Sequence, residues 1–489
     1  MLTIQRRPRT GRDAQALLGA EGVNIGLGVI SQIILTRTLL DVEYGWWVIV
    51  YDLFATLLLV LDFGIPTLVA RDGPAKPTRI RAMVHYGLRI QCRIAAFTLP
   101  PILLIAWIGF DDMRTSIAIL SLAIGAALMY LSGTHRVALR AIGEAREEAI
   151  ARVIDKGLMV GGYAVVWAIG RDGLMEFAMV YAGASMISTI YAIWRSERKL
   201  TASPQEDIQP EEDAKTLLIR AAPFALTLVI LPLMARMDKF LLAGFQGLEL
   251  VAVYNIAWIV LMAGWAVPRS IQQAILPVFS NASANEGALR TEQVRAMHLV
   301  GLLTPFGIFV ALPIATIGLP ALFPNSLVEA RPGEGIDAVS LFVLMLPAWV
   351  WGLLSSPMLE STKLSNRTTT YARVILVGLA VNLTAGLLLV PTFSLKGAAI
   401  STTIGHLCIH LQTIRTSGMW NNLQCRSIMT MQLIAGILLH IAATTLALTK
   451  SIESTWIKWG IPLCCFVLAT LLILKPTRED WSTFRQVRD

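Results

Sequence analysis

The feature that most constrains this chain is a series of apolar stretches, each about 20 residues long, separated by short polar connections. A helix of that length crosses the hydrocarbon core of a bilayer, and it satisfies its backbone hydrogen bonds internally. We therefore predict an all-α, multi-pass membrane protein with about fourteen transmembrane helices. The predicted spans are 15–37, 45–70, 83–109, 115–136, 151–170, 173–194, 217–245, 251–279, 295–322, 338–360, 371–391, 397–415, 428–449 and 456–474.

Composition supports this class. Apolar residues make up 55% of the 489 residues and charged residues only 15%, whereas about a quarter of an ordinary soluble domain is charged. So few charges cannot cover the surfaces of two or three soluble domains, and a disordered chain would be more polar. The five cysteines lie in or beside apolar stretches without a CxxC pair, so we expect neither a disulfide framework nor a metal cluster from them.

The basic residues predict the topology. They gather before the first span, after the last, and in every second connection, such as the one that carries Arg136, Arg140 and Arg152. Short cytoplasmic connections retain Lys and Arg, so both termini are predicted to be cytoplasmic in a cell (plasma or inner) membrane. Because this pattern explains the net charge of +8, that charge does not indicate a nucleic-acid partner.

An internal repeat predicts two halves. Residues 146–153 and 367–374 share Arg, Ala, Arg and Val at the same spacing, and each segment enters the fifth span of its half. Two six-span halves would share one orientation and be related by an axis along the membrane normal. The predicted domains are an N-terminal bundle at 1–195, a cytoplasmic linker at 196–216, a C-terminal bundle at 217–415, and two extra helices with a tail at 416–489.

Ionisable residues inside the spans are the candidate functional groups. A charge at mid-membrane is costly, and such groups normally face a wet cavity or a charged partner. They concentrate in the first spans of each half. A structural ion pair is an equal alternative for Asp238, and anchoring to lipid phosphates is an equal alternative for Arg89 and Arg93. The candidate substrate-binding residues are Arg37, Asp62, Arg89, Arg93, Arg236, Asp238 and Lys239.

Motifs for catalysis are absent from the sequence. It contains no phosphate-binding GxxxxGK[ST] loop, no HExxH and no GxSxG, so we predict neither an enzyme nor a bound cofactor. His406 and His410 have the i, i+4 spacing of metal ligands, but no third ligand lies nearby in sequence. We therefore expect hydrogen-bonded helix histidines and no metal site.

Three segments resemble the O-antigen and lipid-linked oligosaccharide flippase family. They are Arg37–Gly45 followed by Leu61–Pro66, Arg236–Gly244, and Leu389–Ile400. This family shares a superfamily with the multidrug-and-toxin extruders and the peptidoglycan-precursor flippase. The resemblance extends over nearly the whole chain, and fourteen spans are usual in such proteins.

The resemblance implies a flippase that moves a polyprenyl-diphosphate oligosaccharide from the cytoplasmic to the outer leaflet by alternating access. We expect Arg37, Arg236 and Lys239 to supply positive charge, and Asp62 and Asp238 to orient the substrate or couple an ion. The implied partners are the lipid-linked sugar, membrane lipids, H⁺ or Na⁺, and polysaccharide assembly proteins.

Two other functions are open. An ion-coupled multidrug or metabolite antiporter of the same fold would bind cations and would need a cavity rich in carboxylates, whereas the candidate residues here mix both signs of charge. A membrane polysaccharide polymerase or ligase would carry a large outer loop, whereas the outer connections predicted here are short.

Overall fold

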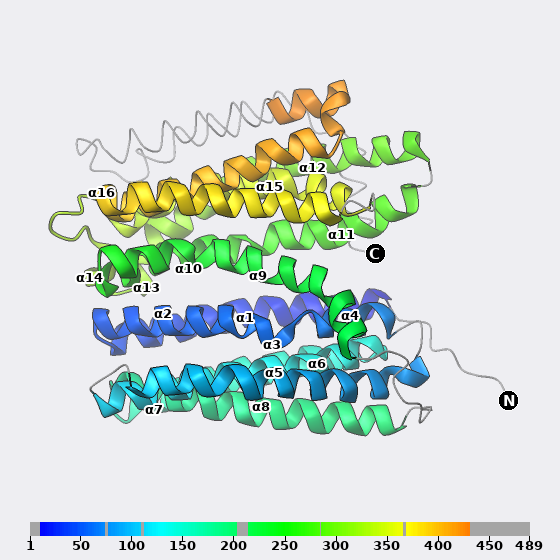
Figure 1. Ribbon diagram of the computed structural model, residues 1–489. Helices are drawn as coiled ribbons and strands as arrows, with labels where there is room; N and C mark the ends of the chain where they lie inside the picture. The colour runs from blue at the N-terminus through cyan, green and yellow to red at the C-terminus, as the bar shows by residue number, and fades with distance from the viewer. Residues whose placement is uncertain are drawn as a thin grey trace. The chain divides into compact units, whose positions relative to one another are not determined.

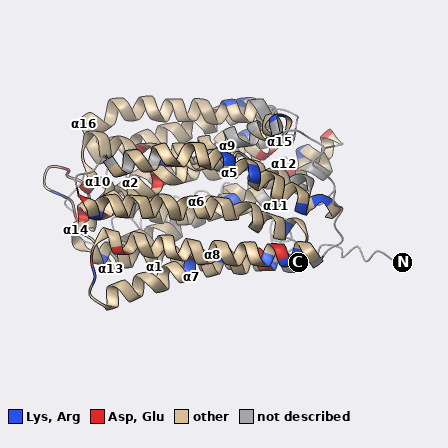
Figure 2. Ribbon diagram, turned by 60° about the horizontal axis from the view of Figure 1, so that its bottom comes forward, with Lys and Arg blue, Asp and Glu red and all other residues tan. Residues whose placement is uncertain are grey.

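The structure is a computed structural model that describes residues 10–73, 77–108, 112–202, 214–283, 285–364 and 368–430. All regular structure in these ranges is helical. Six of the described helices are long and apolar enough to cross a membrane. The last two predicted spans lie almost entirely outside the described residues. Charged residues lie mostly toward the ends of the helices, and the middle of each helix is largely uncharged (Figure 2).

The chain divides into two compact units, Met1–Pro232 and Leu233–Asp489, with the division inside helix α9. The helices of the first unit run side by side (Figure 1). In chain order they are α1 Thr10–Thr38, α2 Asp41–Leu57, α3 Leu59–Asp62, α4 Ile65–Asp72, α5 Ile80–Ile108, α6 Met113–Ala141, α7 Ala145–Ala168 and α8 Leu174–Ala202, and α9 follows at Ala214–Phe245.

The second unit is built around α15, whose apolar window is 83% buried. A π-helical turn at Ile314–Gly318 follows α12, and the long α16 contains two helices that meet at Ser394, where φ is 49°. The helices are α10 Leu248–Gly264, α11 Ala266–Ala282, α12 Glu286–Pro313, α13 Leu319–Leu322, α14 Asn325–Val328, α15 Ala338–Leu364 and α16 Thr368–Thr416.

Local sequence explains where several helices begin and end. The Asp112 carboxylate accepts a hydrogen bond from the backbone N–H of Thr115 at 2.9 Å and so caps α6, and Asn285 caps α12 in the same way. The chain leaves α6 through Gly143, whose φ of 80° suits a residue without a Cβ.

Small residues allow close packing between helices. A Cβ at Gly125 of α6 would lie 2.7 Å from the ring of Tyr181 in α8, and one at Gly307 of α12 would lie 2.2 Å from Trp349 in α15. Such close approach is the usual basis of helix association in membranes, where van der Waals contact replaces the hydrophobic driving force.

Candidate functional site

The second predicted span, 45–70, is not one continuous helix. It breaks after Asp62, because Phe63 and Gly64 both adopt the left-handed conformation, with φ of 41° and 72°. Pro66 then opens α4 within its first two positions, where its missing N–H costs nothing. The break places the carboxyl group of Asp62 at the end of a short helix in the interior of the unit.

Side chains of two neighbouring helices support this break. The amide of Gln91 in α5 donates to the backbone carbonyl of Asp62 at 3.4 Å, and the hydroxyl of Thr134 in α6 donates to the oxygen of Gln91 at 2.8 Å. Gln91 and Thr134 are both buried. One carboxyl oxygen of Asp62 is also buried, and it has no hydrogen-bond partner among the described residues. A buried acceptor of this kind is costly, which suits a group that binds something transiently.

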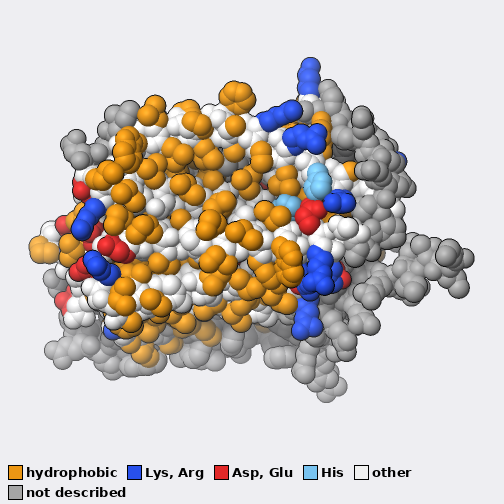
Figure 3. Space-filling view, turned by 90° about the horizontal axis from the view of Figure 1, so that it is seen from below, with side chains coloured by type: hydrophobic (Ala, Val, Ile, Leu, Met, Phe, Trp, Pro, Cys, Tyr) orange, Lys and Arg blue, Asp and Glu red, His pale blue; other side chains and the backbone are white. Residues whose placement is uncertain are grey.

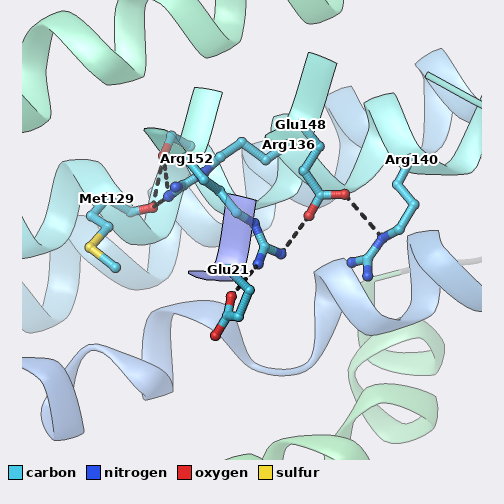
Figure 4. Close-up of polar contacts among 7 residues, drawn as sticks. Glu21, Met129, Arg136, Arg140, Glu148 and Arg152 are labelled. Carbon is cyan, nitrogen blue, oxygen red and sulfur yellow. Dashed lines mark hydrogen bonds and ion pairs between the residues drawn. The ribbon is translucent and has the colours of Figure 1, made fainter. Parts of the chain in front are cut away.

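An ion-pair network joins α1, α6 and α7 at one end of the first unit (Figure 4). Its centre is Glu148, which is 1% exposed and lies 2.6 Å from Arg152 and 3.2 Å from Arg140. Arg152 also lies 3.8 Å from Glu21 of α1. Arg136 folds back along α6 and donates to the carbonyl of Met129 at 2.8 Å. The network therefore ties α6 tightly to α7, and α1 to α7 through one longer contact.

The sequence does not indicate this network as part of the site. The predicted connection between spans carries Arg136, Arg140 and Arg152, whereas α6 and α7 extend through these residues and are separated by only a short turn. The i, i+4 spacing of Glu148 and Arg152 within the repeated segment is the sequence feature that could have predicted an ion pair here.

Asp238 is the most enclosed candidate in the second unit. Its side chain is fully buried, and its carboxyl oxygens accept hydrogen bonds from Ser401 at 3.1 Å, from Thr402, and from Tyr254 at 3.5 Å. Among the described residues it has no ion-pair partner. The structure therefore favours a hydroxyl-lined carboxyl site over the alternative of a structural ion pair.

The adjacent Lys239 projects to a different set of groups. Its ammonium donates to Asn255 of α10 at 2.9 Å and lies 5.8 Å from the centre of the Trp258 ring. Asn382 of α16 is also fully buried, and neither of its side-chain polar atoms has a hydrogen-bond partner in the described part of the chain. The helices α9, α10 and α16 thus bring a carboxyl group, an ammonium group and polar side chains into one buried region.

The remaining candidates lie outside these clusters. Arg37 is exposed in the last turn of α1, and Arg236 is partly buried in α9. Arg89 and Arg93 are exposed one turn apart on α5, and within the described ranges neither forms an ion pair. The structure does not gather all seven candidates around one point within either unit.

The two helix histidines both form hydrogen bonds. His406 lies 2.9 Å from the carbonyl of Thr402, one turn earlier in α16, and His410 lies 3.1 Å from the hydroxyl of Ser355 in α15. The described residues contain no group of three His, Cys, Asp or Glu side chains suited to a metal ion.

Helices long and apolar enough to cross a membrane, with backbone breaks and buried ionisable groups among them, are features of a multi-pass membrane protein. Comparison with protein families assigns the chain more closely. A model described as polysaccharide biosynthesis protein matches residues 10–283. The chain belongs to this family, which confirms the predicted relationship. Comparison with curated protein sequences finds no match.

Several solved structures share the fold. A lipid II flippase MurJ in an inward closed conformation aligns with a TM-score of 0.66 and 12% identity, over 94% of this chain and 97% of that chain. An outward-facing multidrug resistance MATE transporter of the MOP superfamily aligns with a TM-score of 0.62 and 14% identity, over 86% of this chain and 96% of that chain. A MOP superfamily transporter from Pyrococcus furiosus aligns with a TM-score of 0.63 and 14% identity, over 85% of this chain and 95% of that chain. At these identities the likeness shows the fold alone, and it confirms the predicted all-α membrane architecture.

Proposed function

We propose that this protein is a flippase that moves a lipid-linked oligosaccharide, carried on a polyprenyl diphosphate, from the cytoplasmic to the outer leaflet of the cell membrane. The diphosphate and the sugars cannot cross hydrocarbon unaided, so the protein must offer them a polar path while the lipid tail stays in the bilayer. The observation that carries the proposal is the presence of cationic side chains within the helices of a polysaccharide biosynthesis protein.

In this proposal the cations attract the diphosphate. Arg37, Arg236 and Lys239 lie on α1 and α9, and Arg89 and Arg93 lie together on an exposed face of α5. A guanidinium group suits a phosphate because its planar fork donates two parallel hydrogen bonds. Alternating access then requires that each unit present these groups first to one side of the membrane and then to the other.

The carboxyl groups would couple transport to an ion. Asp238 lies among three hydroxyl groups, and Asn382 nearby leaves its amide oxygen without a partner. A buried carboxyl among oxygen donors suits a proton or a hard cation such as Na⁺. Asp62 provides a second buried carboxyl oxygen, beside the break between α3 and α4.

An ion-coupled antiporter that exports organic cations is the second candidate. The burial of Asp238 without an ion-pair partner in the described ranges favours the antiporter, because a carboxylate of that kind attracts a cation. The exposed arginines of α5 favour the flippase, because they would repel such a substrate. A polymerase or ligase is the third candidate. The chain would then join the sugar units covalently.

A reconstituted system separates these functions. The full chain is placed in liposomes that hold a fluorescent polyprenyl-diphosphate oligosaccharide, and added dithionite quenches the label on the outer leaflet. We expect protein-dependent loss of the protected fluorescence, faster with a proton or sodium gradient than without one. Gradient-driven movement of ethidium in the same liposomes, with no movement of the lipid-linked sugar, would establish the antiporter. Lengthened sugar chains would establish the polymerase.

The double variant Arg236→Ala, Lys239→Ala tests the cationic groups within the same assay. We expect normal insertion and a loss of translocation, because the diphosphate loses two positive charges. The variant Arg290→Ala serves as a control, since that arginine is exposed near the start of α12 and outside the candidate residues. Wild-type translocation by the double variant at equal protein level would remove the cationic groups from the mechanism.

A further inference from the structure

The outer face of α8 carries an exposed apolar stripe. Met186, Ile187, Ile190 and Trp194 recur at helical spacing, and each is about half exposed. Figure 3 shows the face of the first unit to which α8 contributes, with hydrophobic side chains across its middle and charged side chains toward both ends. In a membrane protein such a stripe contacts the acyl chains of lipids.

The stripe ends at a cation, Arg198. The Arg198 guanidinium lies 5.7 Å from the centre of the Trp194 ring and is exposed. The neighbouring cations of α8 are already neutralised by α7, since Arg195 pairs with Glu147 and Lys199 with Glu144 at 2.9 Å. Among the described residues, Arg198 forms no ion pair. Within the described part of α8, a positive charge without an ion-pair partner therefore remains at Arg198.

The dimensions of the stripe match one leaflet of a bilayer. Twelve residues separate Met186 from Arg198, which corresponds to about 18 Å along a helix. Half of a hydrocarbon core measures about 15 Å. An acyl chain that lies along Met186, Ile187 and Ile190 would therefore place its phosphate beside Arg198, with Trp194 at the level of the ester groups, where tryptophan is enriched.

We propose that α8 holds one anionic glycerophospholipid, with its phosphate on Arg198 and an acyl chain along the stripe. The apolar stripe requires a ligand with a chain, which favours a lipid over a free phosphate. The uncompensated charge of Arg198 favours an anionic head group over a zwitterionic one. This site depends only on the membrane location of the chain and does not involve the residues proposed to move the oligosaccharide.

The test measures lipid binding to the purified full chain in detergent. Dioleoyl phosphatidylglycerol is titrated, and bound lipids are counted by native mass spectrometry. We expect Arg198→Gln to weaken the tightest binding about fivefold, the effect of one interfacial cation. Arg198→Lys keeps the charge and should retain most of the affinity. The control Arg146→Gln removes an exposed cation from the first turn of α7 and should leave the affinity unchanged.

Other ligands define the site further. Phosphatidylcholine should bind the wild-type chain and Arg198→Gln alike, and glycerol phosphate should not displace the bound phosphatidylglycerol. Equal affinity of wild type and Arg198→Gln for phosphatidylglycerol would overturn the proposal. An equal loss of affinity in Arg146→Gln would also overturn it, because the lipid would then respond to the net charge of the protein and not to Arg198. Displacement by glycerol phosphate would show an anion site without a lipid.

Discussion

Replacing Asp238 by Asn separates a transport role from a structural one, because the two roles predict opposite changes in stability. The substitution keeps the shape of the side chain and removes its charge. Asp238 is fully buried, and its described partners are hydroxyl groups and no cation. Among the described residues no cation compensates a carboxylate held in this way, so its charge destabilises the cation-free state.

The magnitude follows from the neighbouring hydrogen bonds. Ser401 and Thr402 both have a second acceptor in the carbonyl of Ala398, at 2.9 and 3.1 Å. Both hydroxyl groups therefore keep a hydrogen-bond acceptor when the carboxylate is lost. Leaving a buried charge uncompensated costs about 3–5 kcal/mol, so removal of this charge should stabilise the protein by up to that amount, less what the hydroxyl hydrogen bonds to the carboxylate contribute. If Asp238 instead stabilises the fold, loss of its hydrogen bonds costs about 1–3 kcal/mol.

The assay combines thermal unfolding in detergent with the liposome measurement. We expect the melting temperature of Asp238→Asn to rise in cation-free buffer, and translocation to fall at least tenfold at equal protein level. We also expect that addition of Na⁺ or a lower pH stabilises the wild type but not the variant, since a ligand stabilises only the state that binds it. A lower melting temperature with normal translocation would refute the reasoning, because Asp238 would then be structural.

Three further changes test other parts of the structure. Gly64→Ala should destabilise the first unit by about 1 kcal/mol, because φ at Gly64 is 72°, whereas Gly26→Ala in α1 meets no atom within 4 Å and should stabilise it by about 0.5–1 kcal/mol in thermal unfolding, because alanine favours the helix. Glu148→Gln should lower the melting temperature, since the loss of hydrogen bonds to a charged group costs about 1–3 kcal/mol when the remaining arginines stay partly exposed to solvent, and an unchanged melting temperature would show that the network is dispensable. Hydrogen bonds from Arg195 lower the pKa of Glu147, outside the membrane-spanning part of α7, below its usual 4.5. The pair therefore stabilises the protein above about pH 4.5, and this contribution is lost as the pH falls through the lowered pKa. The difference in melting temperature between wild type and Glu147→Gln should accordingly be present at pH 7 and disappear in acid, and a difference independent of pH would contradict the assignment.

Much of the fold follows from the sequence because apolar length alone defines a membrane helix. The predicted spans correspond to long helices in α5, α6, α8 and α15, and the Leu389–Ile400 segment bends where one predicted span gives way to the next, at Ser394. The count of about fourteen spans and the domain bounds remain predictions. The breaks inside spans were not predicted, because hydropathy depends on residue type and carries no information about backbone conformation, such as the left-handed conformation of Phe63 and Gly64.

The candidate site was predictable only in part. Asp238 and Lys239 stand out because charges are rare in apolar spans. Their partners do not stand out, since Ser401 and Thr402 lie more than 160 positions away in sequence and are ordinary residues in a membrane helix. Adjacent charges suggest an ion pair, whereas successive helical residues point in directions about 100° apart, and Asp238 and Lys239 meet different partners.

The proposed transport mechanism requires that ionisable side chains within the helices face a water-filled path. The most direct measurement replaces the native cysteines, introduces a single cysteine at Asp62, Arg236 or Lys239, and treats intact cells and inverted vesicles with a membrane-impermeant maleimide. We predict that each position reacts, and that lipid-linked sugar or a coupling ion changes the side from which it reacts. Protection of all three positions from both sides, under every condition, would contradict the proposed transport mechanism.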